Sequence, residues 1–297
     1  MALAAYLSDT QLLLHDPTAS YFSTASLTTY INDARNQIAQ ESQCVRVLVC
    51  GVISSVTVTA QGASYTSSAT VAATGSGMGA VLVPQINAGA ITSVTVIAGG
   101  TSWDGTTTIA ATDTAGSGAT FTSVQVGNNL TVVNQEIYTF ASRNAAATAI
   151  NSGINQIIGL MGISVSWGSM KPTLQRCTWG DFQANYRAWT TGYLGQPAVW
   201  AQYGQGASGS LYLCPMPSQI MNMDWDCWCT PIALIDDTTA EAIPYPWSGA
   251  VKYYAAYLAF ANSQRLAEAE AMKALYLDKM KTARAASDSV FLPNPYG

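Results

Sequence analysis

A long segment without charge limits what this chain can fold into. Residues 47–103 contain no Asp, Glu, Lys, Arg or His, and they consist largely of Gly, Ser, Thr, Ala and Val. Valine alternates with threonine or serine along much of the segment, which predicts strands with one apolar and one polar face. The segment is too polar to cross a membrane, since a spanning helix needs about 20 consistently apolar residues. It therefore predicts β structure.

The same segment repeats itself. The sequence ISSVTV at residues 53–58 returns as ITSVTV at residues 91–96, an offset of 91 − 53 = 38 positions. With that offset Gly62 matches Gly100 and Tyr65 matches Trp103. After one inserted residue, GMGA at 77–80 matches GSGA at 116–119.

One repeat alone could not bury its apolar face, so the two are expected to pack together. We predict an inserted all-β domain at residues 51–126, made of two repeats. It could serve as a binding knob or as a passive spacer, because insertions at loop tips are tolerated.

Helical patterns lie on both sides of this segment. Apolar spacings of three and four predict helices at residues 3–14, 24–43 and 248–287, with strands between residues 136 and 230. The prediction is an α+β fold, in which a helical core made from N- and C-terminal helices, with central β-strands, carries a small all-β inserted domain. The core would be discontinuous, comprising residues 1–50 and 127–297.

The composition indicates a surface covered by partners. Charged residues make up only 10% of the chain, which has 8 Trp and 15 Tyr, whereas soluble proteins average roughly 25% charged residues. The formal net charge of −5 disfavours a protein that grips nucleic acid phosphates, but it suits a wall past which DNA slides. Neither a signal peptide nor a membrane anchor is expected.

Sequence patterns give little support for catalysis, so we expect no enzyme activity, no catalytic residue, no cofactor and no metal. The single histidine, His15, precedes Asp16 and Pro17 and is interpreted as part of a helix end. Asp236 and Asp237 are interpreted as turn residues. The six cysteines lack metal-site spacing and are expected to be reduced.

Several segments outside the repeats resemble the head-to-tail adaptor proteins of short-tailed bacteriophages. They are LLLHDP (12–17), YFS (21–23), LTTYINDAR (27–35), Trp167-Gly168, WGDFQA (179–184), WAQYG (200–204), GSLYL (209–213), PMP (215–217), IPYPW (243–247) and VKYYAAY (251–257). The inserted repeats resemble Gly- and Thr-rich domains found within phage structural proteins.

The resemblance implies a structural virion protein, a connector at the head–tail junction made in the host bacterial cytoplasm. Its subunits would form a homo-oligomeric ring of about twelve copies. The ring would bind the portal protein on one side and the tail nozzle or tail tube on the other. Double-stranded DNA would pass through the lumen during genome ejection without sequence-specific binding.

Two further expectations concern binding residues. The apolar C-terminal tail is expected to dock on the portal through Val290, Phe291, Leu292, Pro293 and Tyr296. The alternative function is a tail- or fibre-associated module that recognises a glycan or receptor through the β repeats. Tyr65 and Trp103 could then stack on sugars, although such residues more often fill a small core.

Overall fold

The computed structural model describes residues 3–75, 77–103, 106–127, 129–167, 170–187 and 193–287. The chain divides into two compact units. The helical unit comprises Met1–Arg46, Ser152–Asn155 and Trp228–Gly297, and the β-rich unit comprises Val47–Asn151 and Gln156–Cys227. The division into 1–50 with 127–297 and 51–126 stays a prediction.

The predicted fold class is wrong. The chain is mostly β, with 38% strand and 32% helix, and its largest sheet is a six-stranded, nearly closed barrel. It is not a helical core carrying a small β domain. The helical periodicity at the two ends of the chain is strong, so the helices dominated the prediction. Short strands separated by turns give weaker sequence signals, but together they form the larger part of the structure.

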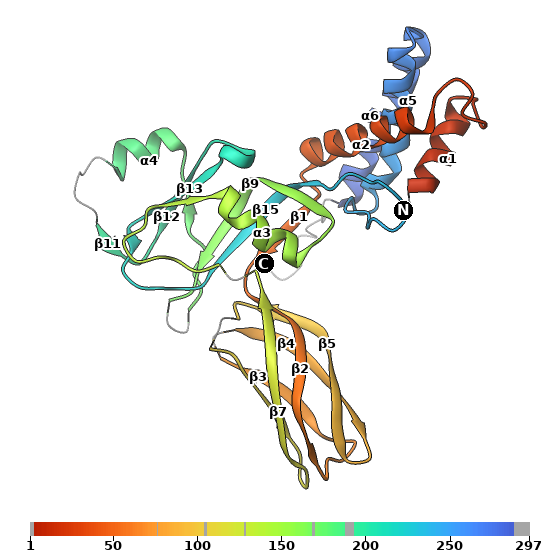
Figure 1. Ribbon diagram of the computed structural model, residues 1–297. Helices are drawn as coiled ribbons and strands as arrows, with labels where there is room; N and C mark the ends of the chain where they lie inside the picture. Colours follow the sequence, from red (N-terminus) through yellow and green to blue (C-terminus); the bar gives the residue numbers. More distant parts are fainter. Residues whose placement is uncertain are drawn as a thin grey trace, which may run out of the picture. The chain divides into compact units, whose positions relative to one another are not determined.

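The barrel belongs to the β-rich unit (Figure 1). Its strands run in the order β6-β3-β4-β5-β2-β7, and all five neighbouring pairs are antiparallel. The strands are β2 (Val52–Ala63), β3 (Thr70–Thr74), β4 (Met78–Asn87), β5 (Ala90–Thr101), β6 (Thr108–Thr112) and β7 (Ser117–Val126). An open cavity of about 750 Å³ lies along the two edge strands, β6 and β7.

The two sequence repeats are related by approximate twofold symmetry in the strand register. Val56 pairs with Val94, which is its own repeat equivalent, and Ala72 pairs with Ala110 in the same way. The pair Leu82–Val96 in one half corresponds to Phe121–Val58 in the other. The two repeats therefore contribute equivalent apolar residues to the barrel core, in which Ile53 and Ile91 are both almost fully buried.

Outside the barrel, the described residues also form three smaller sheets, two α-helices and a 3-10 turn. The four-stranded sheet has the order β10-β12-β13-β8, the three-stranded sheet β1-β15-β9, and the two-stranded sheet β11-β14. The strands are β1 (Arg46–Val49), β8 (Ile137–Thr139), β9 (Ile154–Val165), β10 (Gln175–Arg176), β11 (Leu194–Gly195), β12 (Val199–Tyr203), β13 (Ser210–Cys214), β14 (Met216–Pro217) and β15 (Met223–Pro231), and the helices are α3 (Phe140–Ile150), α4 (Trp179–Asn185) and the 3-10 turn η1 (Gly206–Ser208).

The helical unit packs helices from both ends of the chain together, as the sequence predicted. Leu14, Phe22 and Leu27 from the N-terminal part share a core with Ala256 and Phe260. Ser263, Gln264 and Arg265 interrupt the long C-terminal helix that the sequence predicted, because Gln264 has a φ of 60°. The elements are α1 (Leu3–Leu13), α2 (Thr24–Ser42), the 3-10 turn η2 (Trp247–Ala250), α5 (Val251–Asn262) and α6 (Leu266–Ser287).

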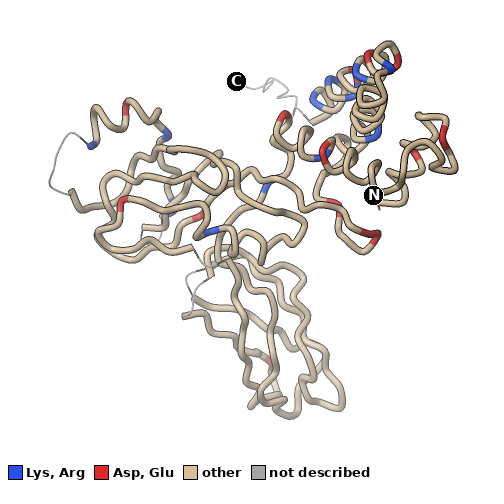
Figure 2. Tube along the Cα trace, turned by 45° about the horizontal axis from the view of Figure 1, so that its top comes forward, with Lys and Arg blue, Asp and Glu red and all other residues tan. Residues whose placement is uncertain are grey.

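Charge is distributed unevenly between these regions. Figure 2 shows Lys, Arg, Asp and Glu concentrated along the helices, whereas the barrel strands are almost free of them. Within residues 51–126 the only charged residues are Asp104 and Asp113. The barrel is therefore stabilised by apolar packing and neutral hydrogen bonds, and charge pairs contribute mainly elsewhere.

Candidate interaction surface

Residues 232–247 form an irregular segment of the helical unit that displays two large apolar side chains. Ile235 is 79% exposed and Tyr245 is 89% exposed, which is the highest value among the exposed large hydrophobic residues of the described chain. Their neighbours Leu234, Ile243 and Trp247 are buried. The segment is thus anchored at several points while these two side chains face solvent.

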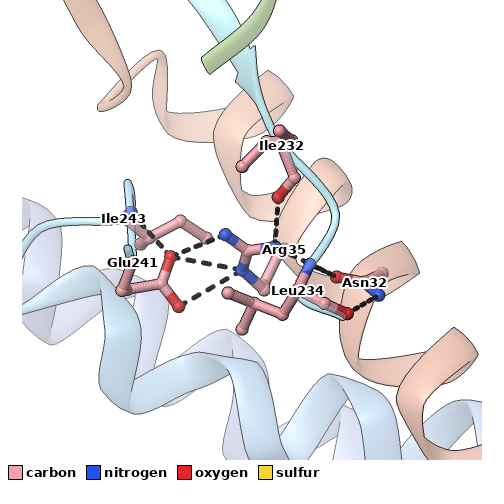
Figure 3. A network of polar contacts seen from close by, with 6 residues as sticks. All are labelled: Asn32, Arg35, Ile232, Leu234, Glu241 and Ile243. Carbon is pink, nitrogen blue, oxygen red and sulfur yellow. Dashed lines mark hydrogen bonds and ion pairs between the residues drawn. The ribbon is translucent and has the colours of Figure 1, made fainter. Parts of the chain in front are cut away.

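A buried arginine of α2 holds this segment in place (Figure 3). The Nε atom of Arg35 lies 3.2 Å from each carboxylate oxygen of Glu241, and Nη2 lies 2.9 Å from Oε1. Nη1 donates to the carbonyl oxygen of Ile232 at 2.7 Å. The guanidinium therefore contacts the start of the segment and its middle at once.

Asn32, one helical turn before Arg35, adds a second clamp. Its Nδ2 donates to the carbonyl oxygen of Leu234 at 3.1 Å, and its Oδ1 accepts from the Leu234 amide at 2.8 Å. The same Oδ1 accepts from Arg35 Nη1 at 3.0 Å. On the other side, Glu241 Oε1 accepts from the amide of Ile243 at 2.9 Å. The buried polar groups of Arg35, Asn32 and Glu241 are thus paired, as a low-dielectric site requires.

The ion pair is almost fully shielded from water. The side chains of Arg35 and Glu241 are 1% and 6% exposed. Two opposite charges so placed are stable only as a pair, since either one alone would carry a large desolvation cost. Burial, followed by the negative charge of Glu241, raises the pKa of nearby Tyr6 above its usual value, so its phenol stays neutral.

The remaining carboxylates of the segment are also occupied. Oδ1 of Asp236 accepts from the amides and hydroxyls of Thr238 and Thr239 at 2.8–3.1 Å. The Thr238 and Thr239 hydrogen bonds lower the pKa of Asp236. Asp237 accepts from the amide of Ala4 at 2.7 Å. These carboxylates act as turn and helix-end ligands, which is the interpretation that the sequence favoured.

This arrangement is suited to recognition. The chain supplies a segment with its backbone tied down by side chains from α2, so Ile235 and Tyr245 are presented without further ordering of the loop. Tyrosine is among the residues that contribute most to protein interfaces, and a side chain that is ordered before binding loses less conformational entropy. We call residues 232–247 with these two side chains the latched segment.

The structure places Tyr65 and Trp103 in the barrel core. Tyr65 is 6% exposed and Trp103 is 2% exposed. The backbone amide of Ala119 donates to the Tyr65 hydroxyl at 3.1 Å. The two backbones make equivalent contacts, Tyr65 N to Gly89 O and Trp103 N to Gly51 O. Both side chains belong to the barrel core, and Tyr65 also lines the open cavity along β6 and β7. Stacking of Trp103 on a sugar would require the core to open.

The remaining residues considered in the sequence are the C-terminal tail, the possible metal ligands and the cysteines. Val290, Phe291, Leu292, Pro293 and Tyr296 lie outside the described residues. Within the described ranges, no three His, Cys, Asp or Glu side chains come together to hold a metal ion. The six cysteines are free thiols, and burial raises the pKa of Cys229 to about 12, which keeps it protonated.

Neither the role of Arg35 nor the segment that it holds was predicted from the sequence. The signal was present, because Arg35 lies four residues after Ile31 and three before Ile38, both fully buried. A charged residue at such a position predicts a buried partner. The partner is Glu241, which lies 206 residues away, and the sequence around Arg35 does not indicate it.

No protein-family model matches the chain, and no curated protein is significantly similar to it in sequence. Across the described helices, none combines the length and the apolarity that crossing a membrane would need.

Proposed function

We propose that the protein is a structural subunit of a bacteriophage particle, a head-to-tail adaptor that assembles into a homomeric ring between the portal and the tail. The observation that carries this proposal is the latched segment, in which a buried ion pair holds Ile235 and Tyr245 in solvent. A subunit of an assembly gains a preformed contact from an exposed loop that is ordered in this way.

The composition of the surface supports the same proposal. The chain combines 10% charged residues with 8 Trp and 15 Tyr. Several large apolar side chains besides the latched segment are more than half exposed, including Leu12, Tyr21 and Leu266 in the helical unit. Contacts on two sides of each ring subunit, and with the portal and the tail, would cover such side chains.

In this proposal, DNA passes through the ring without being tightly bound. A net charge of −5 does not favour tight binding to phosphates, which requires clustered Lys and Arg. The protein would line a passage and make no sequence-specific contact.

Native mass spectrometry of the purified chain, alone and mixed with the portal ring, tests the proposal. We expect a ring of many subunits on the portal. The double variant Ile235→Ser/Tyr245→Ser should lose this assembly, whereas the control Ile220→Ser, which alters a 66% exposed residue of the β-rich unit, should assemble normally. A wild-type chain that stays monomeric in the presence of the portal would contradict the adaptor function.

A further inference from the structure

Arg143, on α3 of the β-rich unit, is a partly buried arginine. Its Nη2 donates to the carbonyl oxygen of Leu130 at 3.2 Å, which is its one hydrogen bond to a described residue. Its guanidinium carbon lies 5.9 Å from the centre of the Tyr138 ring and 5.9 Å from the centre of a Trp225 ring. Two aromatic side chains and one carbonyl therefore fix the position of the guanidinium.

This guanidinium has no carboxylate partner among the described residues, although buried charges in proteins are normally paired. Other buried or partly buried cations of the described chain do form such pairs, among them Arg35 with Glu241, Lys171 with Asp224 and Lys252 with Asp9. Burial lowers the pKa of Arg143, because the charged form loses hydration. Arg143 also lies in the first turn of α3, where the helix dipole disfavours a positive charge. An anion would relieve both effects.

Arg143 keeps free donors for such an anion. Nη1 donates no hydrogen bond to a described residue and, unlike Nε, is not fully shielded from solvent. The rings and the Leu130 carbonyl already hold the planar group in place, so it loses little conformational entropy on binding. The open edge of the guanidinium is therefore preorganised for an oxyanion.

The surroundings of the guanidinium indicate the kind of anion. The Tyr138 hydroxyl accepts from the amide of Val132 at 3.0 Å and lies 3.3 Å from its carbonyl oxygen, so this segment runs beside the site. Val132 is 49% exposed and Ile137 is 39% exposed, and residues 127–142 contain no Lys or Arg. A row of phosphates is bound by clustered cations, whereas one arginine beside apolar side chains suits a carboxylate on a protein surface.

We propose that Arg143 is a preformed binding site for the side-chain carboxylate of an Asp or Glu on a partner protein. The carboxylate would accept from Nη1 and neutralise the guanidinium, and apolar groups beside it would contact Val132 and Ile137. The partner would thereby supply a counter-charge that the described residues do not provide. The inference does not depend on the adaptor function.

NMR spectroscopy of the full chain tests the site with a small probe. The probe is isovalerate, which joins a carboxylate to a branched apolar group, and its neutral amide, isovaleramide, is the matched control. At constant ionic strength, isovalerate should shift the Nε–H signal of Arg143 and the indole N–H signal of Trp225, and the shifts should saturate at about 1–100 mM. Isovaleramide should not shift them.

Arg176 serves as an internal control in the same spectra. Its guanidinium carbon lies 5.3 Å from a Trp200 ring, but the residue is exposed. Hydration already stabilises such a charge, so its Nε–H signal should show no saturating shift.

Substitutions provide a second test, measured through the Trp225 indole signal. Arg143→Lys keeps the charge but loses the planar fork, so isovalerate should bind at least about ten-fold more weakly. Arg143→Met removes the charge and should abolish the shift. Arg176→Met should leave the response unchanged.

Several outcomes would overturn the site. One is a wild-type Arg143 signal that does not saturate, or that shifts no more than the Arg176 signal, and this comparison holds even if a substitution prevents folding. An equal response to isovaleramide would assign the shift to the apolar group alone. Saturation by inorganic phosphate without saturation by isovalerate would make the ligand a phosphate, which also contradicts the proposal.

These measurements need no portal, so the site and the adaptor function can fail separately. A chain that binds isovalerate at Arg143 and ignores the portal would keep this inference and lose the adaptor function. A chain that forms rings on the portal without binding isovalerate at Arg143 would lose the inference alone.

Discussion

The helical unit and the barrel reach order by different physical means. In the helical unit, a buried Arg35–Glu241 pair and Asn32 tie an irregular segment to α2. In the barrel, repeat-equivalent apolar residues such as Ile53 and Ile91 form the core, and charge is nearly absent. The helical unit therefore depends on a few irreplaceable contacts, whereas the stability of the barrel is distributed over many similar contacts.

The largest effect is expected from breaking the Arg35–Glu241 ion pair. Arg35→Ala leaves Glu241 buried without its partner, and breaking such a pair destabilises by about 3–5 kcal/mol. Chemical denaturation followed by helical circular dichroism should show the loss in the helical unit. The matched double variant Arg35→Met/Glu241→Leu removes both charges and should recover much of the stability. A single variant as stable as wild type would show that the pair is not buried in solution.

Removing a core side chain of the barrel should lower the free energy of unfolding by somewhat less. The loss should be similar at equivalent positions of the two repeats. Ile91→Ala and Ile53→Ala remove equivalent side chains that are 0% and 1% exposed. Each should destabilise the barrel by about 2–5 kcal/mol, with similar values for the two positions. Hydrogen exchange of barrel amides is the appropriate measurement, since it reports the barrel separately from the helices. A large difference between the two variants would mean that the repeats are not energetically equivalent.

A smaller loss of stability is expected from substituting two equivalent glycines of the barrel repeats. Gly62 and Gly100 are repeat equivalents with φ values of 64° and 69°. A methyl group at Gly62 would press on the backbone of Ser117 and Ala119, and one at Gly100 on the backbone of Met78 and Ala80. Gly62→Ala and Gly100→Ala should each cost at least about 1–2 kcal/mol from the left-handed conformation. Thermal unfolding measures both, with Gly162→Ala as control because its added methyl meets nothing within 4 Å.

The smallest effect concerns acid stability of the helical unit. Hydrogen bonds from the amides of Phe22, Tyr21 and Ser20 and from the Ser20 hydroxyl lower the pKa of Asp16 to about 2. Because the unfolded value is about 3.9, this contribution is complete above about pH 4 and is lost as the pH falls through about 2.

Asp16→Asn removes this titration. Other acids titrate in the same range, so the quantity to measure is the difference in melting temperature between wild type and variant. That difference should shrink as the pH is lowered from about 4 to 2. A constant difference across this range would show that the Asp16 carboxylate has no depressed pKa.

Much of the local structure could be predicted from sequence. Ser23 and Thr178 cap α2 and α4 by accepting from the amides of Ser26 and Asp181, and such caps are local because they join residues three positions apart. The repeat offset of 38 is visible in the register of Val56 with Val94. The fold class was predicted wrongly, because the pattern of each strand does not reveal how many strands join one sheet.

The exposed side chains of the latched segment could not be predicted from the sequence either. Ile235 and Tyr245 belong to a stretch with no helical or strand period, so nothing local indicates which side chains face solvent. Their exposure depends on Arg35, Asn32 and Glu241 meeting across the chain.

The sequence by itself determined the two repeats, the charge-free barrel strands and the faces of the terminal helices, because these follow from residue type and spacing along the chain. Only the tertiary structure decided that Arg35 pairs with Glu241, that Tyr65 and Trp103 are buried, and that Val81 and Ile97 are exposed. Burial and pairing depend on which distant segments come together, and that is a property of the whole packed chain.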